Sequence, residues 1–133
     1  MLKASYTPYI LHFKVPSGTS RGVLTQKETY FLKVWDEHNP DCFGIGECAL
    51  FKGLGADDRP DYEAMLQTVC RGIDRIDEID LSTWSSIRFG VETALLDLQH
   101  GGRRMIYPSK FTAGKQAIEI NGLIETGIAV LIR

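Results

Sequence analysis

The sequence predicts a single α+β domain, and three observations lead to that prediction. Apolar residues alternate with polar ones through most of the first 50 positions, which is typical of strands. Apolar residues at helical spacing then occupy the stretch from about residue 58 to residue 100. A length of 133 residues suits one domain with a modest core. The predicted order is a three-stranded antiparallel meander, two helices and a final strand.

Three strands are expected over residues 2–15, 29–36 and 42–50, because β-branched, aromatic and other apolar side chains recur there. Residues 16–28, PSGTSRGVLTQKE, are polar and rich in glycine and hydroxyl groups. They predict a mobile loop longer than a hairpin requires. Residues 37–41, EHNPD, predict a tight turn between the second and third strands.

Two amphipathic helices are expected after the third strand. The first has Asp58 as its N-cap and Pro60 in its first turn. The second begins at Ser85, whose hydroxyl can cap it, and stops at the pair Gly101–Gly102. The apolar stripes are Tyr62, Met65, Leu66, Val69, Ile73 and Ile76 in the first helix and Ile87, Val91, Ala94, Leu95 and Leu98 in the second. Residues 117–133 contain one or two further strand-like runs.

Three glycines lie inside the expected elements. Gly44 and Gly46 share one face of the third strand, where they allow close packing or a bulge. Gly90 lies in the interior of the second helix, where glycine costs about 1 kcal/mol relative to alanine. Close approach of another backbone would justify Gly90.

Composition excludes several classes of protein. The net charge is −2 and basic residues are not clustered, so nothing indicates nucleic-acid binding. No apolar run approaches the roughly 20 residues that a membrane span needs, and the N-terminus lacks the pattern of a secretory signal. Three cysteines without a CxxC motif indicate free thiols, and hence a cytoplasmic protein.

Isolated candidate sites are each better explained by ordinary structure. Residues 44–49, GIGECA, match the dinucleotide fingerprint formally, but more glycines and a proline come before any helix. His38, Asp41 and Cys42 could be drawn as a metal site, although a polar turn is the simpler interpretation.

Two carboxylates of the second helix are expected on its solvated faces. They are Glu92 and Asp97, which flank the apolar stripe. Arg88 precedes Glu92 by four residues, so an intrahelical ion pair is available.

Three stretches occur together in one order: GIGECALFKGLG at 44–55, SSIRFGVETALLDL at 85–98 and EINGLI at 119–124. In this arrangement the sequence resembles the N-terminal capping domain of the enolase superfamily. The most specific parts are the dipeptide Gly46–Glu47 and the pattern of Ser86 and residues 91–98. Within the superfamily the resemblance is to the muconate-cycloisomerase-like branch, and to the o-succinylbenzoate synthase family in particular.

The resemblance implies a capping domain over residues 1–116. It also implies that residues 117–133 hold the start of the first barrel strand, at 120–124, followed by a tail that does not match. Residues 17–27 resemble the mobile loop that closes over substrate, and residues 50–55 resemble the second specificity loop. The residues that match these loops, and are therefore expected to bind substrate, are Thr19, Ser20, Arg21, Leu50, Phe51 and Leu54.

The chemistry implied is that of a lyase in menaquinone biosynthesis. Mg²⁺ stabilises the enediolate formed when a proton is abstracted α to a carboxylate, and water is then lost from a small carboxylate substrate. The acid–base lysines and metal ligands belong to a (β/α)-barrel, so no catalytic, metal-binding or cofactor-binding residue is expected in this chain. The expected partner is that missing barrel, and the uncovered barrel-facing surface could also drive self-association.

Two other functions stay open on the sequence. The chain could be a stand-alone α+β ligand-binding or interaction module derived from such a cap. It could also be the cap of a related muconate cycloisomerase or dipeptide epimerase. Either way, the chain alone is not expected to be active.

Overall fold

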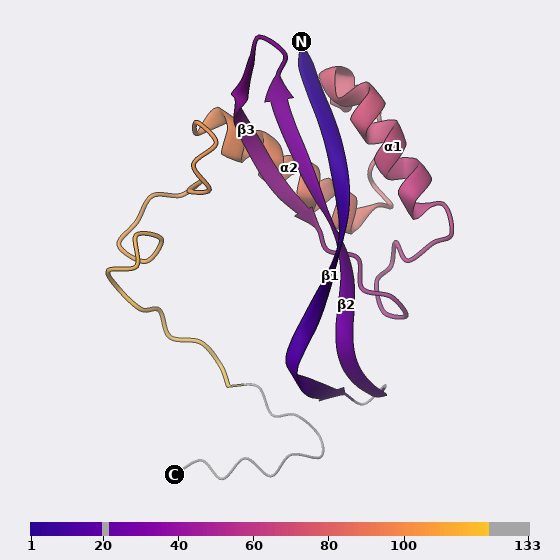
Figure 1. The fold of residues 1–133 in the computed structure, drawn as a ribbon, viewed down its shortest axis with the longest axis vertical. Helices are drawn as coiled ribbons and strands as arrows, with labels where there is room; N and C mark the ends of the chain where they lie inside the picture. The colour runs from indigo at the N-terminus through magenta and orange to yellow at the C-terminus, as the bar shows by residue number, and fades with distance from the viewer. Residues whose placement is uncertain (20–21, 123–133) are drawn as a thin grey trace.

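A computed structural model describes residues 1–19 and 22–122 of the chain. It contains an antiparallel sheet in the order β1-β2-β3, packed against two helices (Figure 1). The predicted α+β class and the three-stranded meander are confirmed. The elements are β1 (Leu2–Thr19), β2 (Gly22–Asp36), β3 (Asn39–Cys48), α1 (Tyr62–Gly72), the 3-10 helix η1 (Ile73–Glu78) and α2 (Ser85–Gln99).

The loop expected over residues 16–28 is wrong for the described part of that stretch. β1 and β2 pair from Leu2↔Asp36 to Thr19↔Gly22, with one irregularity between His12 and Ser17. The pairing of β2 with β3 ends at Tyr30↔Cys48, so residues 22–29 pair with β1 alone. The outer half of the hairpin therefore projects beyond β3 and both helices (Figure 1). This projecting part, residues 9–19 and 22–29, is called the hairpin arm below.

The core lies between one face of the sheet and the two helices. Leu32 and Val34 of β2 point into it and are fully buried. The helices contribute Leu66 and Val69 from α1 and Ile87 from α2, at the positions that helical spacing predicts. The buried apolar set is completed by Cys48, Leu50, Tyr62, Ile73, Trp84, Val91 and Ala94.

Glycines allow β3 and α2 to pack backbone against backbone, as the sequence predicts for Gly44, Gly46 and Gly90. A Cβ built on Gly46 would lie 1.8 Å from the carbonyl oxygen of Gly90. A Cβ on Gly44 would lie 1.8 Å from the carbonyl oxygen of Ala94, and one on Gly90 would lie 2.4 Å from Sγ of Cys48. No side chain larger than hydrogen fits at these positions without moving the helix.

The predicted helix starts need correction. Ser85 is the first residue of α2 rather than its cap, and the helix is capped from a distance: Oδ2 of Asp57 accepts the backbone N–H of Ser86 at 2.8 Å. Asp58 is not the N-cap of α1, because that helix begins at Tyr62. The Asp58 carboxylate accepts the N–H of Gly53 instead. Sequence neighbours alone cannot reveal a cap that comes from another segment.

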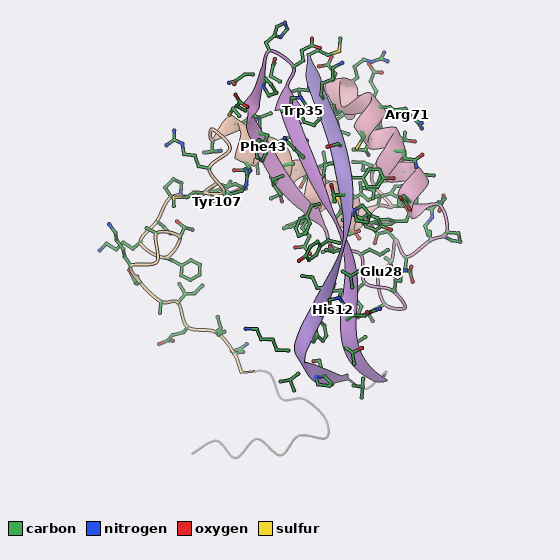
Figure 2. All side chains as sticks on the ribbon, in the orientation of Figure 1. His12, Glu28, Trp35, Phe43, Arg71 and Tyr107 are labelled. Atoms are coloured by element: carbon green, nitrogen blue, oxygen red, sulfur yellow. The ribbon has the colours of Figure 1, made fainter. Side chains whose placement is uncertain are left out.

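The end of α2 is predicted correctly. Gly101 and Gly102 both adopt left-handed backbone conformations, with φ of 84° and 66°, directly after the helix. Residues 101–122 contain no helix or strand, so the strand expected from residue 117 is absent from 117–122, and 123–133 lie outside the described residues. Figure 2 shows Tyr107 on this segment, away from the core. Among the described helices, none is long and apolar enough to cross a membrane.

Candidate functional site

The candidate site lies where the hairpin arm meets the segment that joins β3 to α1, residues 49–61. Because β3 ends at Cys48, this segment rather than a strand flanks the arm part of β2. A groove of about 130 Å³ separates the two, called the arm groove here. It is lined by Leu24, Gln26, Lys27 and Glu28 of β2 and by Leu50, Phe51 and Lys52.

The structure brings only some of the predicted substrate-binding residues together. Leu50 and Phe51 line the arm groove, but Leu50 is 4% exposed and belongs to the core. Leu54 is 55% exposed on the following turn. Thr19 lies in the last pair of the arm, opposite Gly22, roughly 17 Å along the strand from Lys27 at about 3.4 Å per residue.

Two of the predicted residues cannot be placed. Ser20 and Arg21 lie outside the described residues, so the expectation that they bind substrate stays a prediction. The side chain of Thr19 also lies outside what the structure describes, so its role stays a prediction as well. The outer end of the described arm, at Thr19, and the 49–61 segment are two separate parts of the candidate site.

Two lysines give the arm groove its charge. Lys52 forms an ion pair with Glu28, and the hydrogen bond to that carboxylate raises the pKa of Lys52. Nζ of Lys27 lies 5.9 Å from the centroid of the Phe51 ring, within the range of a cation–π contact. Glu28 is labelled in Figure 2, on the part of β2 that β3 does not flank. Lys27 and Glu28 were not predicted because residues 16–28 were expected to form a loop. Lys52 lies in the expected second specificity loop, 50–55, but was not among the residues assigned to substrate binding there.

The 49–61 segment is held in shape by its own hydrogen bonds. The N–H groups of Leu54 and Gly55 both donate to the carbonyl of Phe51, at 3.1 and 2.7 Å. Gly53 has a φ of 76° and donates its N–H to Oδ2 of Asp58 at 2.7 Å. Phe51 is thus presented by a closed turn.

A buried polar network anchors the far end of this segment to α2. Asp57 is 1% exposed, and its Oδ2 accepts both the N–H and the hydroxyl of Ser86, at 2.8 and 2.7 Å. The Ser86 hydroxyl also bonds the Tyr62 hydroxyl at 2.7 Å, and burial raises the pKa of Tyr62. Helix α2 is therefore connected directly to the segment that forms one wall of the arm groove.

Asp97 is buried, which corrects the expectation of a solvated residue. It is 1% exposed, and its carboxylate accepts the N–H of Ile45 at 3.0 Å and the N–H of Arg104 at 2.8 Å. It also pairs with the Arg104 guanidinium, which lies 4.6 Å from the centroid of the Phe43 ring. Burial opposes ionisation, but these hydrogen bonds and the Arg104 charge together lower the pKa of Asp97.

The exposed carboxylate of the same helix behaves as predicted. Glu92 accepts a hydrogen bond from Nε of Arg88 at 2.8 Å, which is the intrahelical pair expected from the spacing. Both side chains are exposed, so the pair contributes little to stability.

The other candidate chemistry falls away in the described residues. Gly44 and Gly46 lie within β3, not at a turn that opens a helix, so the dinucleotide interpretation is excluded. Burial raises the pKa of Cys48 to about 12 and that of Cys70 to about 11, so both thiols stay protonated at neutral pH. Within residues 1–19 and 22–122, no three His, Cys, Asp or Glu side chains are grouped to hold a metal ion.

No protein-family model matches the sequence. A curated relative, the o-succinylbenzoate synthase of Desulfotalea psychrophila, is 32% identical over 167 residues, covering 99% of this chain and 44% of the relative. The crystal structure of MenC from the same organism superposes with a TM-score of 0.68 at 28% identity, covering 92% of this chain and 41% of that one. The chain thus spans less than half the length of the relatives it matches.

More distant structures share the fold. An o-succinylbenzoate synthase from Thermosynechococcus elongatus, complexed with magnesium in its active site, has a TM-score of 0.60 at 24% identity; the match covers 76% of this chain and 30% of that one. An enolase family member from Agrobacterium tumefaciens with homology to dipeptide epimerases has a TM-score of 0.59 at 18% identity, with 78% and 32% covered. The chain is homologous to the N-terminal region of the o-succinylbenzoate synthases, which belong to the enolase superfamily.

Proposed function

We propose that the chain is the substrate-capping domain of an o-succinylbenzoate synthase-like lyase and acts only together with a (β/α)-barrel. The observation that carries the proposal is the extent of the match: 99% of this chain corresponds to 44% of a synthase. The rest of the relative lies outside the match, and the proposal assigns the barrel of about 250 residues to that part. The division into a cap at 1–116 and the start of a barrel strand at 117–133 belongs to the same proposal.

The described residues supply coverage of the substrate rather than acid–base or metal chemistry. They do not fit Mg²⁺, because they contain no group of carboxylates placed to bind it. In the proposed parent enzyme, proton abstraction and loss of water in menaquinone biosynthesis fall to the barrel. A cap held over a barrel excludes water and orients the substrate, which raises the rate without chemistry of its own.

The substrate contacts proposed for the cap divide into two groups. Phe51 and Leu54 are accessible on the turn of the 49–61 segment, while buried Leu50 supports that turn from below. Thr19, at the outer end of the described arm, belongs to the second group, together with Ser20 and Arg21, which lie outside the described residues. The small carboxylate substrate would lie between these groups and the barrel, in the cytoplasm.

The surface of α2 that faces away from the sheet is the proposed contact with the barrel. Phe89 is 65% exposed there and offers a large apolar side chain to that contact. The proposal is tested by expressing the part of the Desulfotalea psychrophila enzyme beyond the match and mixing it with this chain. Sedimentation velocity is expected to show a 1:1 complex.

Two variants sharpen that experiment. Phe89→Asp places a charge in the proposed contact and is expected to abolish the complex. Thr68→Asp adds the same charge to the exposed face of α1 and is expected to leave it intact. Calorimetry of the chain alone should detect no stoichiometric Mg²⁺ binding at micromolar affinity. Absence of any complex with the wild-type chain would contradict the capping function.

A stand-alone binding module is the second candidate. The observation in its favour is that the described residues close a core of their own, with no buried side-chain N or O atom left without a hydrogen bond. A folded monomer that forms no complex with the barrel would support this function. Self-association through the surface around Phe89 would instead support the cap, since that surface is then uncovered.

A further inference from the structure

We infer that Lys27 is the anion-binding residue of the arm groove, and that the groove binds a carboxylate carried on a short aliphatic chain. The inference deepens the proposed function, on which it rests for the natural ligand, by assigning one part of a small carboxylate substrate to one side chain. Lys27 is none of the residues that the sequence assigned to substrate binding.

The described part of the arm groove carries one unpaired positive charge, on Lys27. The groove is lined by two lysines and one glutamate, and Lys52 is already neutralised by Glu28. Among the described residues, no carboxylate lies within ion-pair distance of Lys27. Neighbouring carboxylates are engaged elsewhere: Oε1 of Glu47 accepts the Thr29 hydroxyl at 2.9 Å, Asp57 accepts from Ser86, and Asp58 accepts the N–H of Gly53. One positive charge is left without a partner.

Lys27 contacts the Phe51 ring, and this contact leaves its ammonium group able to bind an anion. An ammonium group over an aromatic face keeps its three N–H donors available, because the ring satisfies charge but is a weak hydrogen-bond acceptor. The Phe51 ring thus holds Nζ at the groove while leaving it free to donate to a carboxylate. The closed turn at residues 51–55 fixes Phe51, so this arrangement exists before any ligand arrives.

The size and polarity of the arm groove suit a small ligand with a charged end and an apolar part. A volume of about 130 Å³ corresponds to roughly four water molecules at about 30 Å³ each. That space holds a carboxylate and a few methylene groups. Leu24, Leu50 and Phe51 offer an apolar wall for the methylenes. A carboxylate at the end of a short aliphatic chain satisfies both parts of the groove.

The test titrates the whole 133-residue chain with succinate and follows its amide resonances by NMR. We expect saturable shifts centred on residues 26–28 and 51–52, with a dissociation constant in the millimolar range. Lys27→Gln is expected to weaken binding about fivefold, and Lys27→Arg to restore most of it. Lys14→Gln removes an exposed lysine of the same arm, outside the groove, and is expected to change binding less than twofold.

Two results would overturn the inference. One is equal binding by Lys27→Gln and wild type. The other is equal weakening by Lys14→Gln, which would mean that only the overall charge of the arm matters. Succinamide, which has the same shape without the charge, should produce no shifts at these residues. Binding of inorganic phosphate as tight as that of succinate would show a general anion site. It would overturn the part of the inference that assigns an aliphatic chain to the ligand.

The same variant separates this inference from the capping function. If the chain activates a separately expressed barrel and Lys27→Gln raises the KM of the mixture with little change in kcat, both stand. An active mixture that is indifferent to Lys27→Gln overturns the inference alone. Succinate binding at Lys27 without any activation of the barrel supports the anion-binding role of Lys27 and contradicts the capping function.

Discussion

Replacing Gly46 with alanine is expected to lower the free energy of unfolding by about 3 kcal/mol, at the upper end of the range for overpacked cores. The new Cβ would lie 1.8 Å from the carbonyl oxygen and 2.7 Å from the carbonyl carbon of Gly90. Both atoms belong to the backbone of α2, so no flexible side chain can move aside. The helix itself must shift, and it carries Ser86, which anchors the 49–61 segment through Asp57.

Urea unfolding followed by circular dichroism measures this change. The midpoint should fall while the m-value stays constant. Gly122→Ala is the matched control, because a Cβ at Gly122 would meet no atom within 4 Å; it should change stability by no more than about 0.5 kcal/mol. Equal stability of the two variants would show that β3 and α2 are not in backbone contact.

Replacing Asp97 with alanine is expected to cost about 3 kcal/mol at pH 7. The change leaves the N–H groups of Ile45 and Arg104 without their acceptor and the Arg104 charge without its partner. Arg104 is partly exposed, which keeps the effect at the lower end of the range for buried pairs. Glu92→Gln, five residues earlier in the same helix and on a solvated face, should change stability little.

The cost of losing Asp97 should depend on pH in one direction. Its pKa is lower in the folded chain than in the unfolded one, so the folded state favours the ionised carboxylate. This contribution is complete above the unfolded value of about 3.9 and is lost as the pH falls through the lower folded pKa. The stability difference between wild type and Asp97→Ala should therefore shrink between pH 7 and pH 3. A constant difference would show that folding does not lower the pKa of Asp97.

The sequence predicted those parts of the fold that leave a periodic pattern. Helical spacing identified both helices, and Gly90 correctly signalled a close backbone contact. The hairpin arm was missed because residues 16–18 and 22–28 are exposed or only half-buried on both faces, so apolar residues do not alternate with polar ones there. Strand pairing with β1, rather than burial, shapes that part of β2.

Asp97 was misjudged although the sequence held a usable signal. It follows Ala94 by three residues and Gly90 by seven, which places it on the face of α2 that packs on β3. A carboxylate on a buried face requires donors, and here Ile45 and Arg104 provide them. Asp57 and Lys27 left no comparable signal. Their roles depend on segments that meet only in the folded chain, at Ser86 and at Phe51 respectively.

The measurement that tests the capping function most directly is activity in a mixture. This chain and a separately expressed barrel of a related synthase are combined, and Mg²⁺-dependent formation of o-succinylbenzoate is followed against each half alone. We expect product to form only in the mixture, and we expect Phe89→Asp, which breaks the proposed contact, to abolish it. No product from the mixture, with the chain folded and monomeric, would contradict the capping function.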